Sequence, residues 1–167
     1  EGRDSARPAR AAVLGLTLVT GAPQLLPSLA GLVRPGGWTG VQVARDGRAI
    51  AALVGERSPD GPVATFSPIH ALEGHLPIYP QFALGPFIVR AAPWIPAEDR
   101  RHYAYFITPN AVPALLGSEP PSAILTGMEG ANDAPLDSFA KSHGYREIPL
   151  SLKKAEDAER VRLYLAP

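Results

Sequence analysis

Apolar residues alternate with polar ones most clearly near the end of the chain. Two runs place an apolar side chain at every second position: Ile148, Leu150 and Leu152, then Val161, Leu163 and Leu165. Alternation of period two is typical of strands that bury one face. With the polar stretch 153–159 between them, the two runs predict a terminal antiparallel hairpin.

Before this hairpin, the pattern predicts a strand, a loop and a helix. Residues 122–126 form a short apolar run after two prolines and predict a buried strand. Residues 127–133 then form its exit loop. Residues 135–143 fit a helix that ends at Gly144, since glycine favours the left-handed conformation that often follows a helix.

The first half of the chain is less regular. Residues 38–54 mix helical and strand spacings around Gly47. We favour a helix, in which Gly47 would cost about 1 kcal/mol relative to alanine. The alternative is a hairpin that turns at Asp46-Gly47. The sequence Ser-Pro-Asp-Gly-Pro at 58–62 predicts a turn, and residues 63–66 predict a short buried strand.

The middle of the chain is rich in proline. Residues 67–98 contain six prolines, so we expect a structured loop region without any long regular element. Residues 100–106 fit either a helical turn or a strand. Thr108-Pro109 predicts the start of a short helix that Gly117 closes.

Together these elements predict one α/β domain with a small mixed sheet, helices, a Pro-rich loop region and a C-terminal antiparallel hairpin. The length of 167 residues suits one domain with a short appended segment. We assign residues 38–167 to the soluble domain and residues 1–37 to a linker or to the end of a last transmembrane helix.

The appended segment contains 23 uncharged residues, 11–33, behind a basic start. That length spans a bilayer as a helix, but glycines and prolines interrupt it. Three interpretations stay open: the end of a transmembrane helix, a signal-peptide-like stretch, and a buried strand and turn. Because the chain starts at Glu1 rather than methionine, we expect a processed protein or a fragment.

Composition excludes several classes of function. Sixteen basic and sixteen acidic residues give a net charge of zero, so no nucleic-acid partner is expected. The chain has no cysteine, which excludes disulfides, thiolate zinc sites and cysteine nucleophiles. The glycine-rich fingerprints of dinucleotide and phosphate binding are absent, as is the Gly-x-Ser-x-Gly elbow of serine hydrolases.

The best candidate for a ligand surface is the loop with His70, Glu73, His75 and Tyr79, where polar groups accompany an aromatic ring as carbohydrate recognition requires. The two histidines are five residues apart, which does not match the i, i+4 spacing of helical zinc ligands. We therefore predict no metal site and no cofactor.

Acidic residues in the exit loop and in the first turn of the following helix are a second candidate. Glu129, Asp133 and Asp137 offer carboxylates for acid–base chemistry at the end of a predicted strand. The favoured interpretation is structural: Asn132 or Asp133 caps the following helix, and Asp137 interacts with the helix dipole.

Aromatic residues gather in and after the proline-rich region. They either line a sugar-stacking or lipid-facing surface, or form the core beneath a long loop. The residues concerned are Tyr79, Phe82, Phe87, Trp94, Tyr103, Tyr105 and Phe106.

Several of these segments carry a resemblance to a known family. They are residues 63–87, with Ser-Pro-Ile at 67–69 and Gly-Pro-Phe at 85–87, then Ser-Ala-Ile-Leu-Thr-Gly at 122–127, Pro135-Leu136, Phe139-Ala140 and His143-Gly144-Tyr145. This pattern resembles the C-terminal extracytoplasmic region of bacterial polytopic glycosyltransferases of the GT-C superfamily, in the family-39 group related to protein mannosyltransferases and aminoarabinose transferases.

The resemblance covers residues 38–165 and implies an accessory domain. In that family the membrane-embedded half performs the transfer from a polyprenyl-phosphate-linked sugar, so no catalytic residue is assigned to this chain. The implied partners are the protein's own transmembrane domain and a lipid-linked sugar or acceptor. The implied location is the bacterial inner membrane, with this domain in the periplasm.

Two other classes of function stay open. One is a stand-alone periplasmic binding or interaction module. The other is a small hydrolase that uses Glu129 and Asp133.

Overall fold

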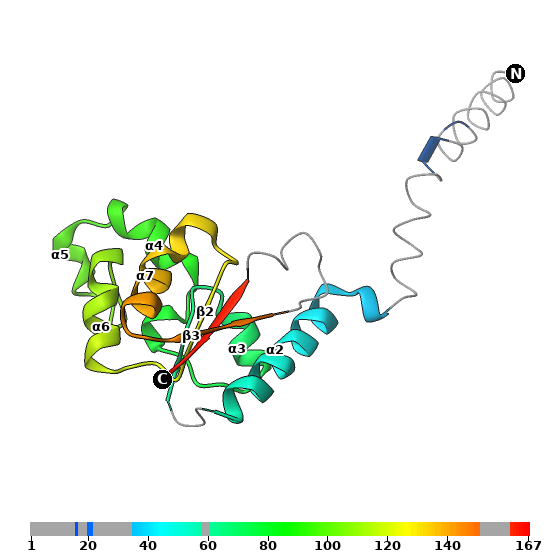
Figure 1. Cartoon of the computed structure of the whole chain (residues 1–167). Coiled ribbons are helices and arrows are strands. Elements are labelled where there is room, and N and C mark those ends of the chain that lie inside the picture. Colours follow the sequence, from blue (N-terminus) through cyan, green and yellow to red (C-terminus); the bar gives the residue numbers. More distant parts are fainter. Residues whose placement is uncertain (1–15, 17–19, 22–34, 58–60, 151–160) are drawn as a thin grey trace, which may run out of the picture. The chain divides into compact units, whose positions relative to one another are not determined.

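The core of the protein is built on a four-stranded sheet (Figure 1). The computed structural model describes residues 16, 20–21, 35–57, 61–150 and 161–167. The chain divides into two units, residues 1–42 and 43–167, and the sheet lies in the second. The assignment of residues 1–37 to a linker or membrane helix stays a prediction, because most of them lie outside the described residues.

The sheet is mixed, as the sequence predicted. Its strands are β1 (Val63–Ala64), β2 (Ala123–Thr126), β3 (Arg146–Pro149) and β4 (Arg162–Leu165), in the order β1-β2-β4-β3. β1 pairs with β2 in parallel, whereas β4 is antiparallel to both β2 and β3. The predicted C-terminal hairpin is therefore confirmed as the β3–β4 pair, and its connection, residues 151–160, lies outside the described residues.

Alternation along the two central strands creates two cores. Ile124 of β2 lies opposite Tyr164 of β4, and both belong to one buried cluster. Their neighbours Leu125 and Leu163 are also paired and belong to the other cluster. Because successive side chains of a strand point to opposite faces, both faces of the sheet are buried.

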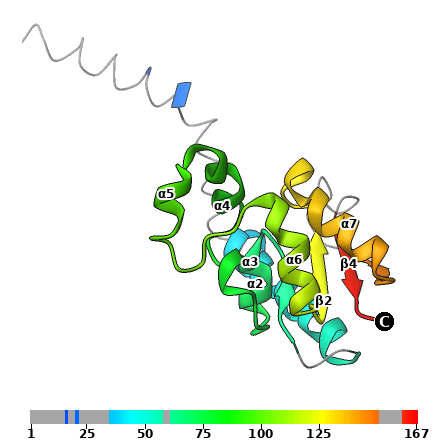
Figure 2. The same cartoon turned by 90° about the vertical axis from the view of Figure 1, so that its left-hand side faces the viewer.

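Helices cover both of these faces. They are α2 (Thr39–Gly55), α3 (Pro68–Glu73), α4 (Pro86–Ala91), α5 (Ala97–Arg100), α6 (Val112–Ser118) and α7 (Ala134–Ser142). α2 and α3 contribute to the cluster of Leu125, whereas α4, α6 and α7 contribute to the cluster of Ile124. Figures 1 and 2 show the resulting three layers, with the sheet in the middle.

The ambiguous residues 38–54 are helical, so the alternative hairpin is wrong. Ile50 and Val54 of α2 are buried against the sheet. Gly47 faces α3 so closely that an added Cβ would lie 2.5 Å from the carbonyl oxygen of His70. Glycine at this position therefore allows the two helices to approach, which explains why a poor helix former occupies the middle of a helix.

The proline-rich region is more helical than the expected loop. Residues 67–98 contain α3, α4, the start of α5 and two 3₁₀ turns, η2 (Pro80–Phe82) and η3 (Ala92–Trp94), and none of the helices exceeds six residues. Prolines start most of these elements, because a proline at the first position of a helix loses no hydrogen bond. The expectation that no long element forms here is confirmed.

Three further predictions concern shorter segments. Residues 100–106 form the end of α5 and the turns after it, rather than a strand. The helix predicted from Thr108 starts with a 3₁₀ turn, η4 (Pro109–Ala111), and continues as α6 to Ser118. Of the turn at 58–62, residues 58–60 lie outside the described residues.

Within the part of the chain that the structure describes, no helix is both long and apolar enough to cross a bilayer. The uncharged stretch 11–33 lies almost entirely outside that part.

Candidate functional site

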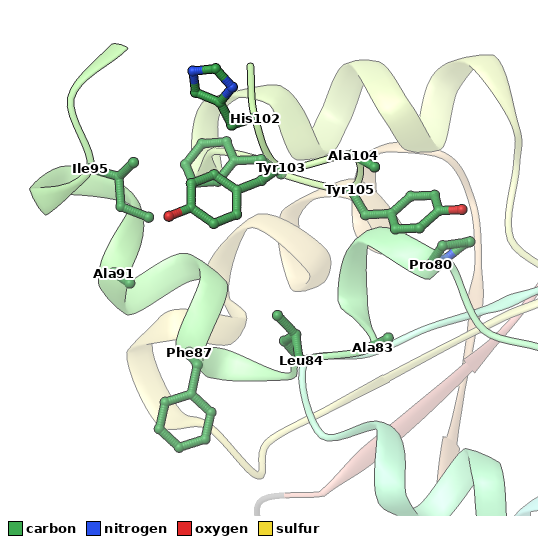
Figure 3. Close-up of a pocket in the computed structure, with 11 residues that line it drawn as sticks. Pro80, Ala83, Leu84, Phe87, Ala91, Ile95, His102, Tyr103, Ala104 and Tyr105 are labelled. Carbon is green, nitrogen blue, oxygen red and sulfur yellow. The ribbon is translucent and has the colours of Figure 1, made fainter. Parts of the chain in front are cut away.

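An apolar groove with a volume of about 580 Å³ opens between the short helices η2 and α4 and residues 102–106 (Figure 3). One wall comes from η2, α4 and the residues that join them, and the facing wall comes from residues 102–106. The lining residues are Pro80, Ala83, Leu84, Phe87, Ala91, Ile95, His102, Tyr103, Ala104, Tyr105 and Phe106. We call this site the apolar groove.

Two short helices build the first wall. Each is anchored to the core of the domain by a buried side chain. Phe82 of η2 and Val89 of α4 point into the core, whereas Leu84 and Phe87 stay outside it. The turn between the two helices depends on Gly85, which has φ of 61°. A Cβ at Gly85 would lie 3.0 Å from the carbonyl oxygen of Phe66, so this turn fits only glycine well.

Arg100 fixes the second wall. Its Nε donates a hydrogen bond to the carbonyl oxygen of Ile95 at 3.0 Å, and its Nη2 donates to that of Ala92 at 3.2 Å. The guanidinium carbon lies 5.6 Å from the ring centroid of Phe106, which in turn packs against Tyr103. These contacts hold residues 92–106 as one folded loop.

Large apolar side chains remain exposed around the groove. Phe87 is 72% exposed, Leu84 69%, Tyr105 58% and Tyr103 56%. Trp94, in the neighbouring η3 turn, is 85% exposed. A gathering of exposed large apolar residues is unusual on a soluble surface and typically marks a binding region.

Apart from Phe106, which is half-buried, the aromatic residues of this region therefore divide into two groups. Tyr79 and Phe82 are buried, with ring centroids 5.3 Å apart, as the core interpretation predicted. Phe87, Trp94, Tyr103 and Tyr105 are exposed, as the surface interpretation predicted. Sequence alone did not separate the groups, because the short helices that turn each ring inward or outward have no periodicity long enough to detect.

The predicted ligand residues do not share one surface. His70 lies in α3 and is partly buried, whereas Glu73 and His75 are exposed near the end of the helix. His75 has φ of 57°, in the left-handed region that non-glycine residues seldom adopt. Tyr79 is 1% exposed, and its hydroxyl donates a hydrogen bond to the carbonyl oxygen of Glu119, so its ring offers no face to a ligand.

Burial changes the acid–base properties of two of these residues. It lowers the pKa of His70, an effect that the carboxylate of Asp46 partly opposes. The Nδ1 atom of His70 is buried and has no hydrogen-bond partner among the described residues. Burial also raises the pKa of Tyr79, with a further contribution from Glu119. Ligand binding by His70, Glu73 and His75 stays a prediction.

Among the described residues, no group of three or more histidine, aspartate or glutamate side chains is placed to hold a metal ion.

The carboxylates of the exit loop and of the first turn of α7 each have a structural partner. Asp133 is buried, and its Oδ2 accepts hydrogen bonds from the backbone N–H groups of Gly127 at 2.7 Å and Glu129 at 3.0 Å. Asp133 occupies the N-cap position of α7, one of the two positions expected for the cap, but its side chain makes no capping hydrogen bond and instead closes the loop before the helix. Burial raises its pKa, while the backbone hydrogen bonds oppose that change.

The other two carboxylates pair with arginines. Glu129 Oε2 lies 3.0 Å from Nη2 of Arg90, and burial raises the pKa of Glu129 although Arg90 opposes the shift. Asp137 accepts a hydrogen bond from Thr126 Oγ1 at 2.8 Å and one from Arg162 Nη1 at 3.1 Å. These contacts tie α7 to strands β2 and β4, which favours the structural interpretation over the hydrolase.

The sequence indicates the groove only in part. Closely spaced prolines and aromatic residues point to a surface here, because the prolines prevent a long helix from burying the rings, and Phe87, Tyr103 and Tyr105 do line the groove. Leu84, Ile95 and His102 belong to no motif, so the sequence does not mark them.

Comparisons of this chain with protein-family models, with curated proteins and with solved structures found no match.

Proposed function

We propose that this chain is the accessory extracytoplasmic domain of a polytopic membrane glycosyltransferase, which transfers a sugar from a polyprenyl-phosphate donor with catalytic residues outside this chain. The domain would lie in the periplasm and contact its own transmembrane part. It would serve by binding and not by catalysis. The sequence resemblance of residues 38–165 suggests this role.

The apolar groove is the observation that carries the proposal of a binding role. Its open mouth and exposed aromatic rim offer a contact site, whereas the carboxylates of the exit loop are committed to structural partners. An exposed apolar surface of this kind suits a domain whose enzyme acts on a lipid-linked substrate, because the surface can contact lipid or another part of the enzyme.

The first test uses the product of the complete reading frame, expressed in bacterial membranes. Two forms are compared, one intact and one without residues 38–167, for membrane insertion and for sugar transfer from a polyprenyl-phosphate donor. We expect the shortened form to insert normally and to lose transfer. Normal transfer without residues 38–167 would contradict the proposal.

A finer test changes only the groove. Leu84→Asp and Phe87→Asp place a charge on its wall, and we expect each to reduce transfer at least tenfold. Ala52→Asp adds the same charge at an exposed position of α2, so it serves as the matched control. A complete product that fractionates as a soluble protein without transfer would instead favour the stand-alone periplasmic binding module.

A further inference from the structure

We infer that the apolar groove binds the hydrocarbon chain of a single amphiphilic molecule, whose polar head stays in water at the His102 edge. The inference rests on the proposed binding role of the domain and names the chemistry of the ligand. It follows from the lining of the groove, from its shape and from the way in which its walls are held.

The lining excludes a sugar as the main ligand. Apart from backbone atoms, the polar groups of the lining are the imidazole of His102 and the hydroxyls of Tyr103 and Tyr105. A sugar brings several hydroxyl groups, and each one buried without a hydrogen bond costs free energy. A hydrocarbon chain has no such requirement and gains from every apolar contact.

Some backbone carbonyl groups at the groove already accept hydrogen bonds from within the protein. The carbonyl oxygens of Ala92 and Ile95, beside the second wall, already accept hydrogen bonds from Arg100. An extended peptide needs free backbone partners along its length, as in the addition of a strand to a sheet edge. The groove therefore suits a chain without backbone polar groups better than an extended peptide.

The concave shape favours one chain over a bilayer surface. A volume of about 580 Å³ lies in the range of about 300–1,000 Å³ that is typical of small-molecule sites. A flat membrane surface would touch the rim and leave the interior of the groove unfilled. In Figure 3, Leu84 points into the space between the two walls, where a chain would contact it.

The walls are formed before any ligand binds. Arg100 fixes residues 92–106, and Gly85 fixes the turn between η2 and α4. A preformed site loses little conformational entropy on binding, which favours measurable affinity even for a simple chain. Figure 3 places the imidazole of His102 at one edge of the groove, where a polar head can remain hydrated.

The test titrates the 167-residue chain with alkyl phosphocholines of six, eight and ten carbons, each kept below its micelle concentration. Binding is followed by calorimetry and by amide chemical shifts. We expect affinity to increase up to about fourfold per added CH₂, the value for full burial of each methylene. Alkyl maltosides should bind with similar affinity at equal chain length, whereas maltose alone should not bind.

Variants that fill the groove with a larger side chain test whether binding occurs there. Ala83→Trp and Ala104→Trp each place a large apolar side chain in the groove, and we expect at least a tenfold loss of affinity for the ten-carbon probe. Ala52→Trp, at an exposed position of α2 outside the groove, should bind like the wild type. Far-UV circular dichroism and thermal unfolding check that all variants are folded.

Three results would overturn the inference: unchanged affinity in both groove variants, affinity independent of chain length, or binding to phosphatidylcholine vesicles without binding to the monomeric probes. The last would assign the rim to a bilayer surface. Since no assay here measures sugar transfer, the inference and the proposed function can fail separately. Chain binding by a protein without transfer activity would overturn only the transferase role.

Discussion

Single residues of this protein show how burial decides what a polar side chain does. The sequence predicts His70 as part of a ligand surface, yet the residue is partly buried in α3 and its Nδ1 atom is buried. Asn132 or Asp133 is predicted as the cap of α7, and Asp133 does occupy the N-cap position, yet its carboxylate closes the preceding loop. In both cases the residue type suggested the chemistry, and the packing around the residue decided how far its side chain is exposed and what it contacts.

We expect stability to fall with acidification in a way that depends on His70. Burial lowers the pKa of His70 in the folded state, so the folded protein binds this proton less readily than the unfolded chain. The contribution of neutral His70 is therefore fully present above the unfolded pKa of about 6.5 and is lost as the pH falls through the lower folded pKa.

Urea unfolding at pH 7.5 and pH 5 measures this effect, with His70→Gln as the comparison. The wild type should lose more free energy of unfolding between the two pH values than the variant. Burial also raises the pKa of Glu129 and Asp133, but both residues are present in the two proteins, so the difference isolates His70. Equal losses would contradict the prediction.

At the scale of elements, the crossing of α2 and α3 depends on two glycines. Gly47 of α2 and Gly74, just after α3, lie against one another's backbones. A Cβ at Gly47 would lie 2.5 Å from a carbonyl oxygen and 2.9 Å from the backbone nitrogen of Gly74. Since backbone atoms cannot move aside as a flexible side chain does, any larger residue must separate the helices.

We expect Gly47→Ala to destabilise the protein by about 1–3 kcal/mol, the usual cost of overpacking, although alanine favours a helix by about 1 kcal/mol. Gly40→Ala is the matched control in the same helix, because nothing lies within 4 Å of its added Cβ. The control should be neutral or slightly stabilising. Chemical denaturation measures both, and a Gly47→Ala protein as stable as the control would refute the packing argument.

At the scale of the whole molecule, the central strands of the sheet are mostly buried, whereas the proline-rich region exposes many of its side chains to solvent. β2 is buried at all four positions, and β4 at three of four. The groove region between η2 and Phe106 consists of short helices with many exposed side chains. Such a division separates a rigid support from a binding surface.

Amide hydrogen exchange should reveal this division. We expect the slowest amides in β2 and β4, where exchange requires global unfolding, and much faster exchange in α4, α5 and residues 101–106, where local opening is enough. Mass spectrometry with peptide resolution is adequate for the measurement. Protection of residues 86–106 equal to that of β2 would show that the groove belongs to the same cooperative unit.

The sequence by itself determined the elements whose pattern is long or repeated. The terminal strand pair around Ile148 and Leu163, the apolar run at 122–126 and the helix after it were correctly predicted, because each leaves an apolar pattern in the sequence. The predicted burial of only one face is wrong for β4, in which Leu163 and Tyr164 are both buried because helices cover both faces of the sheet. The α/β class follows from these elements. The proline count also correctly excluded a long helix in residues 67–98.

Only the tertiary structure decided where single side chains point. It buried Tyr79 and exposed Phe87, directed Asp133 to a loop, and brought η2, α4 and residues 102–106 together as the apolar groove. Elements of three to six residues are too short for periodicity to mark an inner face. Their orientation is set by long-range packing against the sheet, which no local stretch of sequence encodes.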